Sequence, residues 1–202
     1  VSLFINNNSS PGAGNYSFSG PTNLNSGGQT VALEAADLDG DGDPDLVAVV
    51  IDTDQVLTFE NQGGTLAIPT AINTGDSPVA IAVNDLNRDG RADLIVGKQS
   101  TGFALEVYFG IGPFQYGSAF ELVTTLMPDS LAVADLDQNG FDDIVLNDRQ
   151  SDQIGVVLNS ESGIDNFANL FHLGTQITGV STGDLDGDGL IDVVGVEDAG
   201  NA

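Results

Sequence analysis

The 202-residue sequence lacks cysteine, so no disulfide bond stabilises it and no thiolate can act as nucleophile or metal ligand. Basic residues are almost as scarce, because Arg88, Arg91, Lys98 and Arg149 are the whole supply. Proteins contact phosphate groups mainly through Lys and Arg, so we expect no nucleic-acid partner. No apolar run approaches the roughly 18 residues of a transmembrane helix, so we expect no membrane insertion.

Acidic residues, in contrast, are abundant. There are 30 Asp and Glu, and the formal net charge is −26. A folded chain with this imbalance repels itself unless cations neutralise part of the charge. Disorder is a poor alternative, because hydrophobic residues make up 41% of the sequence and are arranged in short runs. The composition therefore favours a folded protein that binds cations.

The sequence contains few candidates for catalysis. The single histidine, His172, has no nucleophile motif nearby, and we interpret it as a surface or core-edge residue. Glu34, Glu106 and Glu121 could imitate the paired carboxylates of a glycosidase, but we predict that they are solvent-facing strand residues. We expect that the protein is not an enzyme.

A nine-residue motif occurs four times: DLDGDGDPD at 37–45, DLNRDGRAD at 85–93, DLDQNGFDD at 135–143 and DLDGDGLID at 184–192. The motifs start 48, 50 and 49 residues apart. Each lies between short runs rich in β-branched residues, and two further runs follow it, which is typical of strands separated by tight turns. Four strands in each repeat of 40 to 50 residues are typical of propeller blades.

We therefore predict an all-β protein of the β-propeller type, a single domain over residues 1–202 with four blades of about 49 residues. After the last motif the chain contributes one more strand, and the third strand of that repeat is found instead at residues 1–7. We predict that this N-terminal strand completes the last blade, either in its own chain or in a neighbouring copy.

Each motif places oxygen-bearing side chains at loop positions 1, 3, 5 and 9, with glycine at position 6. Ca²⁺ takes six to eight oxygen ligands, which four side chains, the carbonyl of position 7 and water can supply. We predict up to four Ca²⁺ ions. The side-chain ligands are Asp37, Asp39, Asp41 and Asp45; Asp85, Asn87, Asp89 and Asp93; Asp135, Asp137, Asn139 and Asp143; and Asp184, Asp186, Asp188 and Asp192. The carbonyl ligands are those of Asp43, Arg91, Phe141 and Leu190.

Other metal sites fit the motif less well. An EF-hand requires Glu at position 12 and flanking helices, whereas position 12 here is Ala48, Val96, Leu146 or Gly195. Mg²⁺ prefers few protein ligands in octahedral geometry, and zinc sites are built from Cys and His. The remaining alternative is a set of Asp-Gly turns without metal, which would leave 16 of the 30 acidic residues packed in four loops without cations.

The loop D-x-[DN]-x-[DN]-G-x-x-D between two strands, repeated at about fifty residues, resembles the FG-GAP or VCBS repeats of integrin α-subunits and bacterial surface proteins. The segment YFGIGP at 108–113 is similar to the elements that name the repeat. The resemblance covers essentially the whole chain. It implies Ca²⁺ in the loop between the first two strands of a blade, an extracellular or cell-surface location, and adhesion or ligand binding.

The resemblance also implies a protein or carbohydrate ligand on the face opposite the calcium loops. That face comprises residues 24–29, 51–55, 73–77, 98–103, 147–153 and 197–202. We interpret Lys98 and Arg149, which lie in it, as solvated surface charges. Asn7, Asn8 and Asn15 occupy glycosylation sequons.

Three functions remain open from the sequence. The first is a non-enzymatic adhesion or ligand-binding module. The second is a structural subunit that polymerises through its N-terminal strand into an extracellular filament or surface layer. The third is a propeller belonging to a polysaccharide-degrading enzyme.

Overall fold

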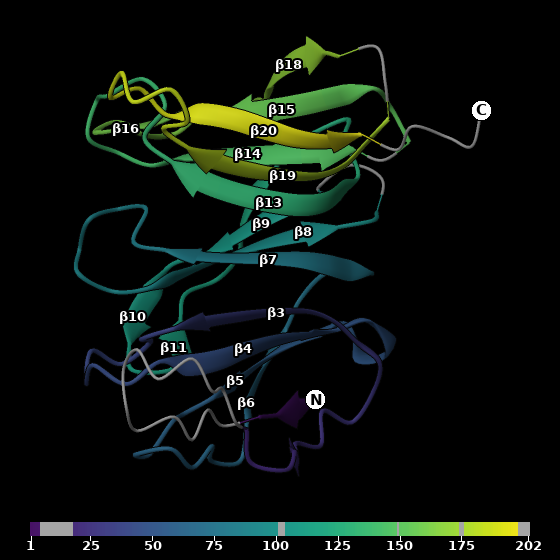
Figure 1. Ribbon diagram of the computed structural model, residues 1–202, viewed down its shortest axis with the longest axis vertical. Helices are drawn as coiled ribbons and strands as arrows, with labels where there is room; N and C mark the ends of the chain where they lie inside the picture. The colour runs from purple at the N-terminus through teal and green to yellow at the C-terminus, as the bar shows by residue number, and fades with distance from the viewer. Residues whose placement is uncertain (5–17, 101–103, 149, 174–175, 198–202) are drawn as a thin grey trace.

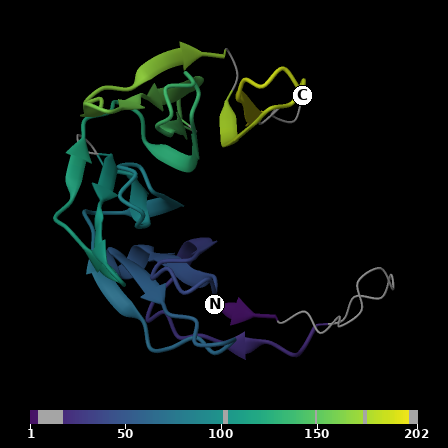
Figure 2. The ribbon, with the colours of Figure 1, turned by 90° about the vertical axis from the view of Figure 1, so that its left-hand side faces the viewer.

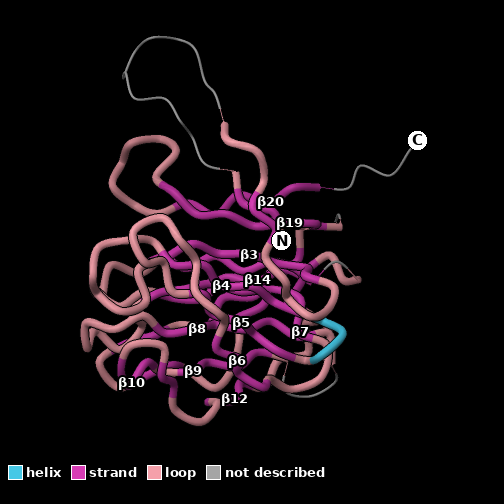
Figure 3. The backbone as a smooth tube through the Cα atoms, turned by 90° about the horizontal axis from the view of Figure 1, so that it is seen from below, coloured by secondary structure: helices cyan, strands magenta, loops and turns pink. Residues whose placement is uncertain are grey.

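The structure is a computed structural model that describes residues 1–4, 18–100, 104–148, 150–173 and 176–197. Strands dominate it, and they form sheets stacked one on the next along the chain (Figure 1). In Figure 3 the strands lie in the middle of the molecule and the loops that connect them lie at either end of the strands. The single helix of the described residues is the one-turn η1 (Ile51–Thr53). None of the described helices is long and apolar enough to cross a membrane.

Three sheets have four antiparallel strands each. The first contains β3 (Thr30–Ala36), β4 (Asp45–Val50), β5 (Gln55–Phe59) and β6 (Thr70–Asn73). The second contains β7 (Pro78–Asn84), β8 (Asp93–Lys98), β9 (Leu105–Tyr108) and β12 (Phe120–Leu122). The third contains β13 (Pro128–Ala134), β14 (Asp143–Asp148), β15 (Gln153–Val157) and β18 (Asn169–His172). We call them blades 1, 2 and 3.

Two-stranded sheets make up the rest. After blade 3 the chain forms β19 (Ile177–Gly183) and β20 (Asp192–Glu197). Near the N-terminus, β1 (Ser2–Leu3) pairs with β2 (Thr22–Asn23). Two hairpins interrupt blades 2 and 3 before their fourth strand: β10 (Gly110–Gly112) with β11 (Gln115–Tyr116), and β16 (Asn159–Ser160) with β17 (Gly163–Ile164). The sequence pattern did not predict these hairpins.

The repeat extends to the strand register. In every first pair, the last residue of the first strand lies opposite the position-9 aspartate: Ala36 with Asp45, Asn84 with Asp93, Ala134 with Asp143 and Gly183 with Asp192. All four pairs also have a register irregularity near the start of the first strand. The predicted repeat of about 49 residues is therefore a repeat of strand pairing.

Apolar residues on both faces of each blade form the core, because neighbouring blades pack face to face. Ile95 and Leu105 of blade 2 cluster with Ile144 and Leu146 of blade 3. A second cluster joins blades 1 and 2 through residues including Val47 and Leu94. Burial on both faces explains why the second strands read as continuous runs such as DLVAVV rather than as alternating patterns.

The blades follow one another around an open arc, and β1 and the pair β19–β20 lie on opposite sides of its opening (Figure 2). An all-β, propeller-like fold is thus confirmed. The N-terminal strand pairs with β2, Ser2–Leu3 opposite Thr22–Asn23, and β1–β2 and β19–β20 form separate sheets. Residues 5–7 of the predicted strand lie outside the described residues. Completion by a neighbouring copy stays a prediction.

Candidate metal loops

Each nine-residue motif forms the loop between the first and second strands of its sheet, as the sequence predicts. All four loops therefore lie at equivalent places, and β3–β4, β7–β8, β13–β14 and β19–β20 present them. The predicted side-chain ligands of each loop lie within one nine-residue turn, and those of different loops lie in different sheets.

The position-9 aspartate anchors each loop to its sheet. One carboxylate oxygen accepts the N–H of position 2 in every loop: Leu38 to Asp45 (2.8 Å), Leu86 to Asp93 (2.9 Å), Leu136 to Asp143 (3.0 Å) and Leu185 to Asp192 (3.0 Å). In the three complete blades the other oxygen accepts an N–H from the end of the third strand: Asn61, Gly110 or Asn159, each at 2.8 Å. Asp45, Asp93 and Asp143 are consequently buried.

The position-1 aspartate closes the turn. Its carboxylate accepts the N–H of the position-6 glycine in all four loops, at 2.8 to 3.0 Å. The glycines that donate have φ between 83° and 92°, and they are Gly42, Gly90, Gly140 and Gly189. This left-handed conformation is open to glycine without steric strain, so glycine at position 6 permits the turn.

Positions 3 and 5 form successive side-chain turns. In loop 1, Asp39 accepts the N–H of Asp41 (3.1 Å) and Asp41 accepts that of Asp43 (2.8 Å), in each case through Oδ1. Equivalent bonds recur in the other three loops. Each of these side chains is therefore held in place by at least one hydrogen bond.

The carboxylates converge. In three loops, one oxygen of each of three carboxylates lies within 4.8 Å of the others: Asp37, Asp39 and Asp41; Asp135, Asp137 and Asp143; and Asp184, Asp186 and Asp192. Such a set of oxygen donors suits Ca²⁺, which is bound by carboxylates and carbonyls in a flexible shell. The donor chemistry of the loops fits the ion implied by the sequence. The ligand role of the position-7 carbonyls stays a prediction.

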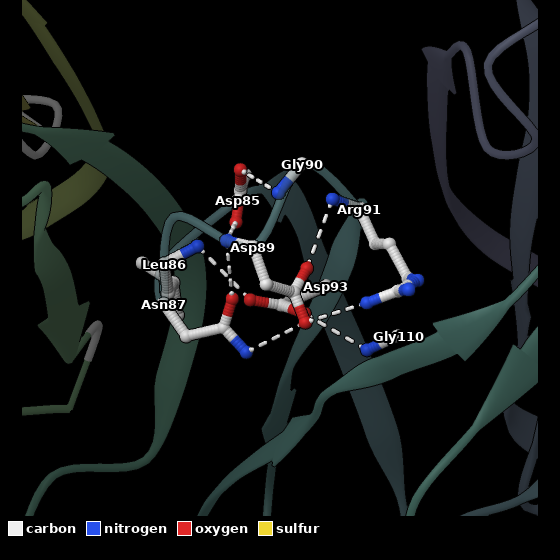
Figure 4. Close-up of polar contacts among 8 residues, drawn as sticks. All are labelled: Asp85, Leu86, Asn87, Asp89, Gly90, Arg91, Asp93 and Gly110. Atoms are coloured by element: carbon white, nitrogen blue, oxygen red, sulfur yellow. Dashed lines mark hydrogen bonds and ion pairs between the residues drawn. The ribbon is translucent and has the colours of Figure 1, made fainter.

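Loop 2 differs from the others in charge (Figure 4). Position 3 is the neutral Asn87, whose amide nitrogen lies 3.3 Å from Asp89 Oδ2. The guanidinium of Arg91 lies 3.1 Å from that same oxygen. A local cation thus compensates part of the negative charge of this loop, so we expect it to bind Ca²⁺ more weakly than the other three.

Burial raises the pKa of the anchoring carboxylates Asp93 and Asp143, so that they ionise less readily in the absence of metal. The pKa of Asp93 is raised to about 6, chiefly by burial and further by Asp85 and Asp89, while the N–H groups of Gly110 and Leu86 oppose the rise. Burial also raises the pKa of Asp143, and the charges of Asp137 and Asp135 add to it. A bound cation would reverse this effect by favouring the charged form.

The comparisons with known proteins agree with this geometry. A family model described as FG-GAP-like repeat matches residues 1–48 and 135–195, which is more than half of the chain. The chain belongs to the FG-GAP-like repeat family. No curated protein matches the sequence at a significant level.

Among solved structures, the FG-GAP chain is similar to BBS1N in complex with ARL6DN. A crystal soaked with mercury gives a TM-score of 0.52 at 20% identity, over 78% of this chain and 44% of that one. A crystal soaked with lead gives a TM-score of 0.52 at 16% identity, over 82% of this chain and 53% of that one. The chain spans about half the length of these solved chains, and at such low identity the likeness concerns the fold alone.

The structure also explains the Phe-Gly element of the FG-GAP repeat. Phe109 and Gly110 directly follow β9, where the N–H of Gly110 caps Asp93. A Cβ on Gly110 would lie 2.6 Å from the carbonyl oxygen of Ala92, inside the loop. The glycine therefore permits the third strand to approach the metal loop closely.

Position 4 of the FG-GAP loop is a feature that sequence reasoning missed. It has positive φ in all four loops, although only Gly40 and Gly187 are glycines. Arg88 (φ 60°) and Gln138 (φ 57°) hold the same conformation in loops 2 and 3. Arg88 lies over the ring of Phe141, 5.2 Å from its centre, and Gln138 donates to the carbonyl of Gly189 (2.9 Å). Arg88 thus connects the second loop to the third, and Gln138 connects the third loop to the fourth.

Two predictions about charged residues were wrong. Lys98 and Glu106 are not solvent-facing but buried, at 4% and 3% exposure, and form an ion pair with each other between β8 and β9. Glu106 also accepts hydrogen bonds from the Tyr108 hydroxyl (2.8 Å) and the Gly75 N–H (3.2 Å). Blade 1 covers this pair through Gly75, which is why no strand pattern within blade 2 could reveal its burial.

The other residues considered in the sequence analysis have the following positions. Glu121 is exposed, as predicted, and Glu34 is half-buried. His172 is exposed on β18, where its ring lies beside Gln153 and Asp152. Arg149 and the sequons at Asn7, Asn8 and Asn15 lie outside the described residues.

Proposed function

We propose that this chain is a calcium-binding propeller module that acts outside the cytoplasm by binding a protein or carbohydrate ligand, without catalysis. The observation that carries the proposal is the repeated loop, in which the same side-chain oxygens are held by the same backbone hydrogen bonds four times. Membership of the FG-GAP-like repeat family supports the propeller.

Calcium is the ion that best matches both the loops and the composition. The net charge of −26 needs compensation, and only four basic side chains are available. Two of these four side chains do not compensate the charge of the first, third or fourth loop, because Lys98 is paired with Glu106 and Arg91 is paired with Asp89 in the second loop. Extracellular calcium modules bind with Kd of about 10⁻⁴ to 10⁻³ M, so the millimolar calcium outside cells would occupy such sites.

A protein ligand has support from the solved structures. The similar BBS1N chains are in complex with ARL6DN, and we extend to this chain only the use of the propeller as a binding platform. The ligand face that we propose is opposite the metal loops, where η1 and the segments that follow β2 and β6 lie. Its charge differs from our expectation, because the ammonium group of Lys98 is buried there and cannot reach a ligand.

Calcium removal tests the proposal. With 1 mM calcium and the Kd range above, each site contributes roughly 0.4 to 1.4 kcal/mol of stability by mass action, and four sites about 2 to 6 kcal/mol. We expect excess EDTA to lower the melting temperature measured by circular dichroism, and calcium but not an equal concentration of magnesium to restore it. An unchanged melting curve in EDTA, with no calcium found by elemental analysis of protein purified in calcium, would contradict the proposal.

A further inference from the structure

One buried side chain, Asn159 at the start of β16, joins the second metal loop to the third. Asn159 is only 2% exposed. Its Nδ2–H group donates to the carbonyl of Leu86, at position 2 of loop 2 (2.8 Å), and to the carbonyl of Asp142, at position 8 of loop 3 (3.1 Å). A single amide group thus holds the backbone of both loops, although 73 positions separate Asn159 from Leu86 in the sequence.

The backbone of Asn159 holds predicted ligands of loop 3. Its N–H donates to the carboxylate of Asp143 (2.8 Å), and its carbonyl accepts the Nδ2–H of Asn139 (2.7 Å). On the other side of the link, the N–H of Leu86 donates to the carboxylate of Asp93 in loop 2 (Figure 4). Hydrogen bonds therefore run without a break from a predicted ligand of loop 2, through Leu86 and Asn159, to two predicted ligands of loop 3.

Two further contacts join the same pair of loops. The guanidinium of Arg88 in loop 2 lies over the ring of Phe141 in loop 3, 5.2 Å from its centre. Asn84, the last residue of β7, donates its Nδ2–H to the carboxylate of Asp142 (3.0 Å). Loop 2 is thus attached to loop 3 through a backbone carbonyl, an aromatic ring and a carboxylate, so the two loops cannot be displaced independently without breaking these contacts.

Loops 1 and 2, in contrast, are separated by a cavity of about 330 Å³, lined by residues that include Leu38 and Arg91. The corresponding space between loops 2 and 3 is about 120 Å³. Two glycines explain the difference. Position 4 of loop 1 is Gly40, and Gly110 caps the metal loop of blade 2 where Asn159 caps that of blade 3, so neither position has a side chain that could bridge loops 1 and 2.

We propose that loops 2 and 3 bind their cations cooperatively, whereas loop 1 binds independently of them; this inference rests on the calcium-binding function proposed above. Ordering a flexible loop costs conformational entropy. When Asp143 and Asn139 are held in an occupied loop 3, Asn159 is held with them, and Leu86 transmits the restraint to Asp93. Loop 2 then has less freedom to lose, so its affinity is higher, and linkage makes the effect reciprocal.

Cooperative binding has a consequence for the contact between blades. The boundary between blades 2 and 3 becomes ordered over a narrower range of calcium concentration than the boundary between blades 1 and 2, because two coupled loops fill together. Loop 2 also has its charge partly compensated by Arg91, so loop 3 is the one that fills first and raises the affinity of its neighbour.

Tryptophan reporters can measure the loops separately, because the natural chain contains no tryptophan. Phe141→Trp places an indole at position 7 of loop 3 and keeps an aromatic ring beneath Arg88, and Asp43→Trp places an indole at position 7 of loop 1. Terbium, which occupies oxygen-ligand calcium sites, luminesces when a nearby tryptophan is excited. The perturbation is the same for both reporters: Asp89→Ala, which removes a predicted ligand of loop 2.

We expect Asp89→Ala to raise the terbium concentration for half-saturation at least about fivefold when it is read from Phe141→Trp, and less than about twofold from Asp43→Trp. Both reporter loops are neighbours of loop 2, so the comparison isolates the link. Equal shifts from the two reporters, or no shift from either, would overturn the coupling and leave the proposed calcium binding in place. No terbium luminescence at either loop would overturn the proposed function and the coupling together.

Asn159→Ala tests whether the buried amide carries the coupling, because it removes the bond to Leu86 and keeps the backbone groups. The matched control is Asn61→Ala, since the side chain of Asn61 donates to the carbonyl of Pro44 within its own loop (2.9 Å). In the Phe141→Trp background, we expect the shift caused by Asp89→Ala to fall below about twofold with Asn159→Ala and to persist with Asn61→Ala.

Arg88→Gly is a second variant that should fold, because glycine already occupies position 4 in loops 1 and 4 and relieves the positive φ of Arg88. It removes the contact with Phe141, so we expect the shift caused by Asp89→Ala to decrease by about twofold or more. A shift that stayed unchanged with both Asn159→Ala and Arg88→Gly would show that these contacts do not couple the loops and would overturn the proposal.

Discussion

Gly110 offers a sharp test of how the third strand supports a metal loop. Its N–H donates to the buried carboxylate of Asp93 at 2.8 Å, and a Cβ added to it would lie 2.6 Å from the carbonyl oxygen of Ala92. The obstacle is backbone, which no side-chain rotation can remove. Gly110→Ala must therefore push β9 away from the loop and lengthen or break the bond to Asp93.

The expected magnitude combines two effects. Forcing extra volume into a packed site destabilises by roughly 1 to 3 kcal/mol, and losing a hydrogen bond to a charged group by roughly 1.5 to 3 kcal/mol. Because one backbone shift relieves the clash by sacrificing the bond, we expect about 2 to 4 kcal/mol rather than the full sum. For a chain of this size, 1 kcal/mol lowers the melting temperature by about 2 to 4 °C. We therefore expect a decrease of about 5 to 15 °C in saturating calcium, measured by circular dichroism.

Gly117→Ala is the matched control, since it makes the same substitution in the same blade. A Cβ on Gly117 would meet only the Phe109 carbonyl oxygen, at an ordinary contact distance of 3.7 Å. Its backbone φ is not in the left-handed region, so we expect a change within about 1 kcal/mol. If the two variants melted at the same temperature, the proposed close approach of β9 to the loop would be wrong.

Three further predictions concern charge. Asp41→Ala should destabilise the protein in calcium and change its stability little in EDTA, where losing a carboxylate also relieves repulsion. The control is Asp43→Ala, which removes a carboxylate but keeps the position-7 carbonyl. Equal losses of stability with and without calcium would show that Asp41 is a turn residue only. In EDTA, the free energy of unfolding should fall as pH rises from about 4 to about 7. The reason is that the folded-state pKa of Asp93 (about 6) exceeds its unfolded value near 3.9, so the folded state binds the extra proton. The effect is at most about 3 kcal/mol, and melting curves in saturating calcium should not show this trend. Lys98→Met should destabilise by about 3 to 5 kcal/mol, since it leaves Glu106 buried without its partner, and adding Glu106→Leu should recover most of that loss, which urea unfolding of the single and double variants can measure.

The sequence was sufficient to predict the repeated strand pairs and the position of each nine-residue loop between them. Both are local: a run such as DLVAVV favours a strand through its β-branched residues, and the spacing from Asp37 to Asp45 determines the turn by hydrogen bonds within nine residues. Features of this kind repeat wherever the motif repeats. The N–H groups that bond Asp45, Asp93 and Asp143 come from just after the third strand of the same repeat, 16 or 17 residues further along the chain.

The burial of Lys98 and Glu106 could not be predicted in this way. Both residues lie on strands, where a charged side chain usually marks the solvent face. In this fold each blade is covered on both faces, and the covering group for this pair is the backbone at Gly75, which belongs to blade 1. A Cβ on Gly75 would clash with the Lys98 ammonium. The information therefore resides in the contact between two repeats, and neither repeat carries it alone.

Position 4 shows how the same loop can serve as a metal site and as a contact between blades. Its left-handed backbone favours glycine, and Gly40 and Gly187 occupy it in loops 1 and 4. Arg88 and Gln138 accept the same strained φ in loops 2 and 3, which for a non-glycine residue requires compensation from its surroundings. Both find it in the loop of the following blade, through Phe141 and Gly189. The nine-residue motif thus also links neighbouring blades, and loop 4, where position 4 is glycine, makes no such contact among the described residues.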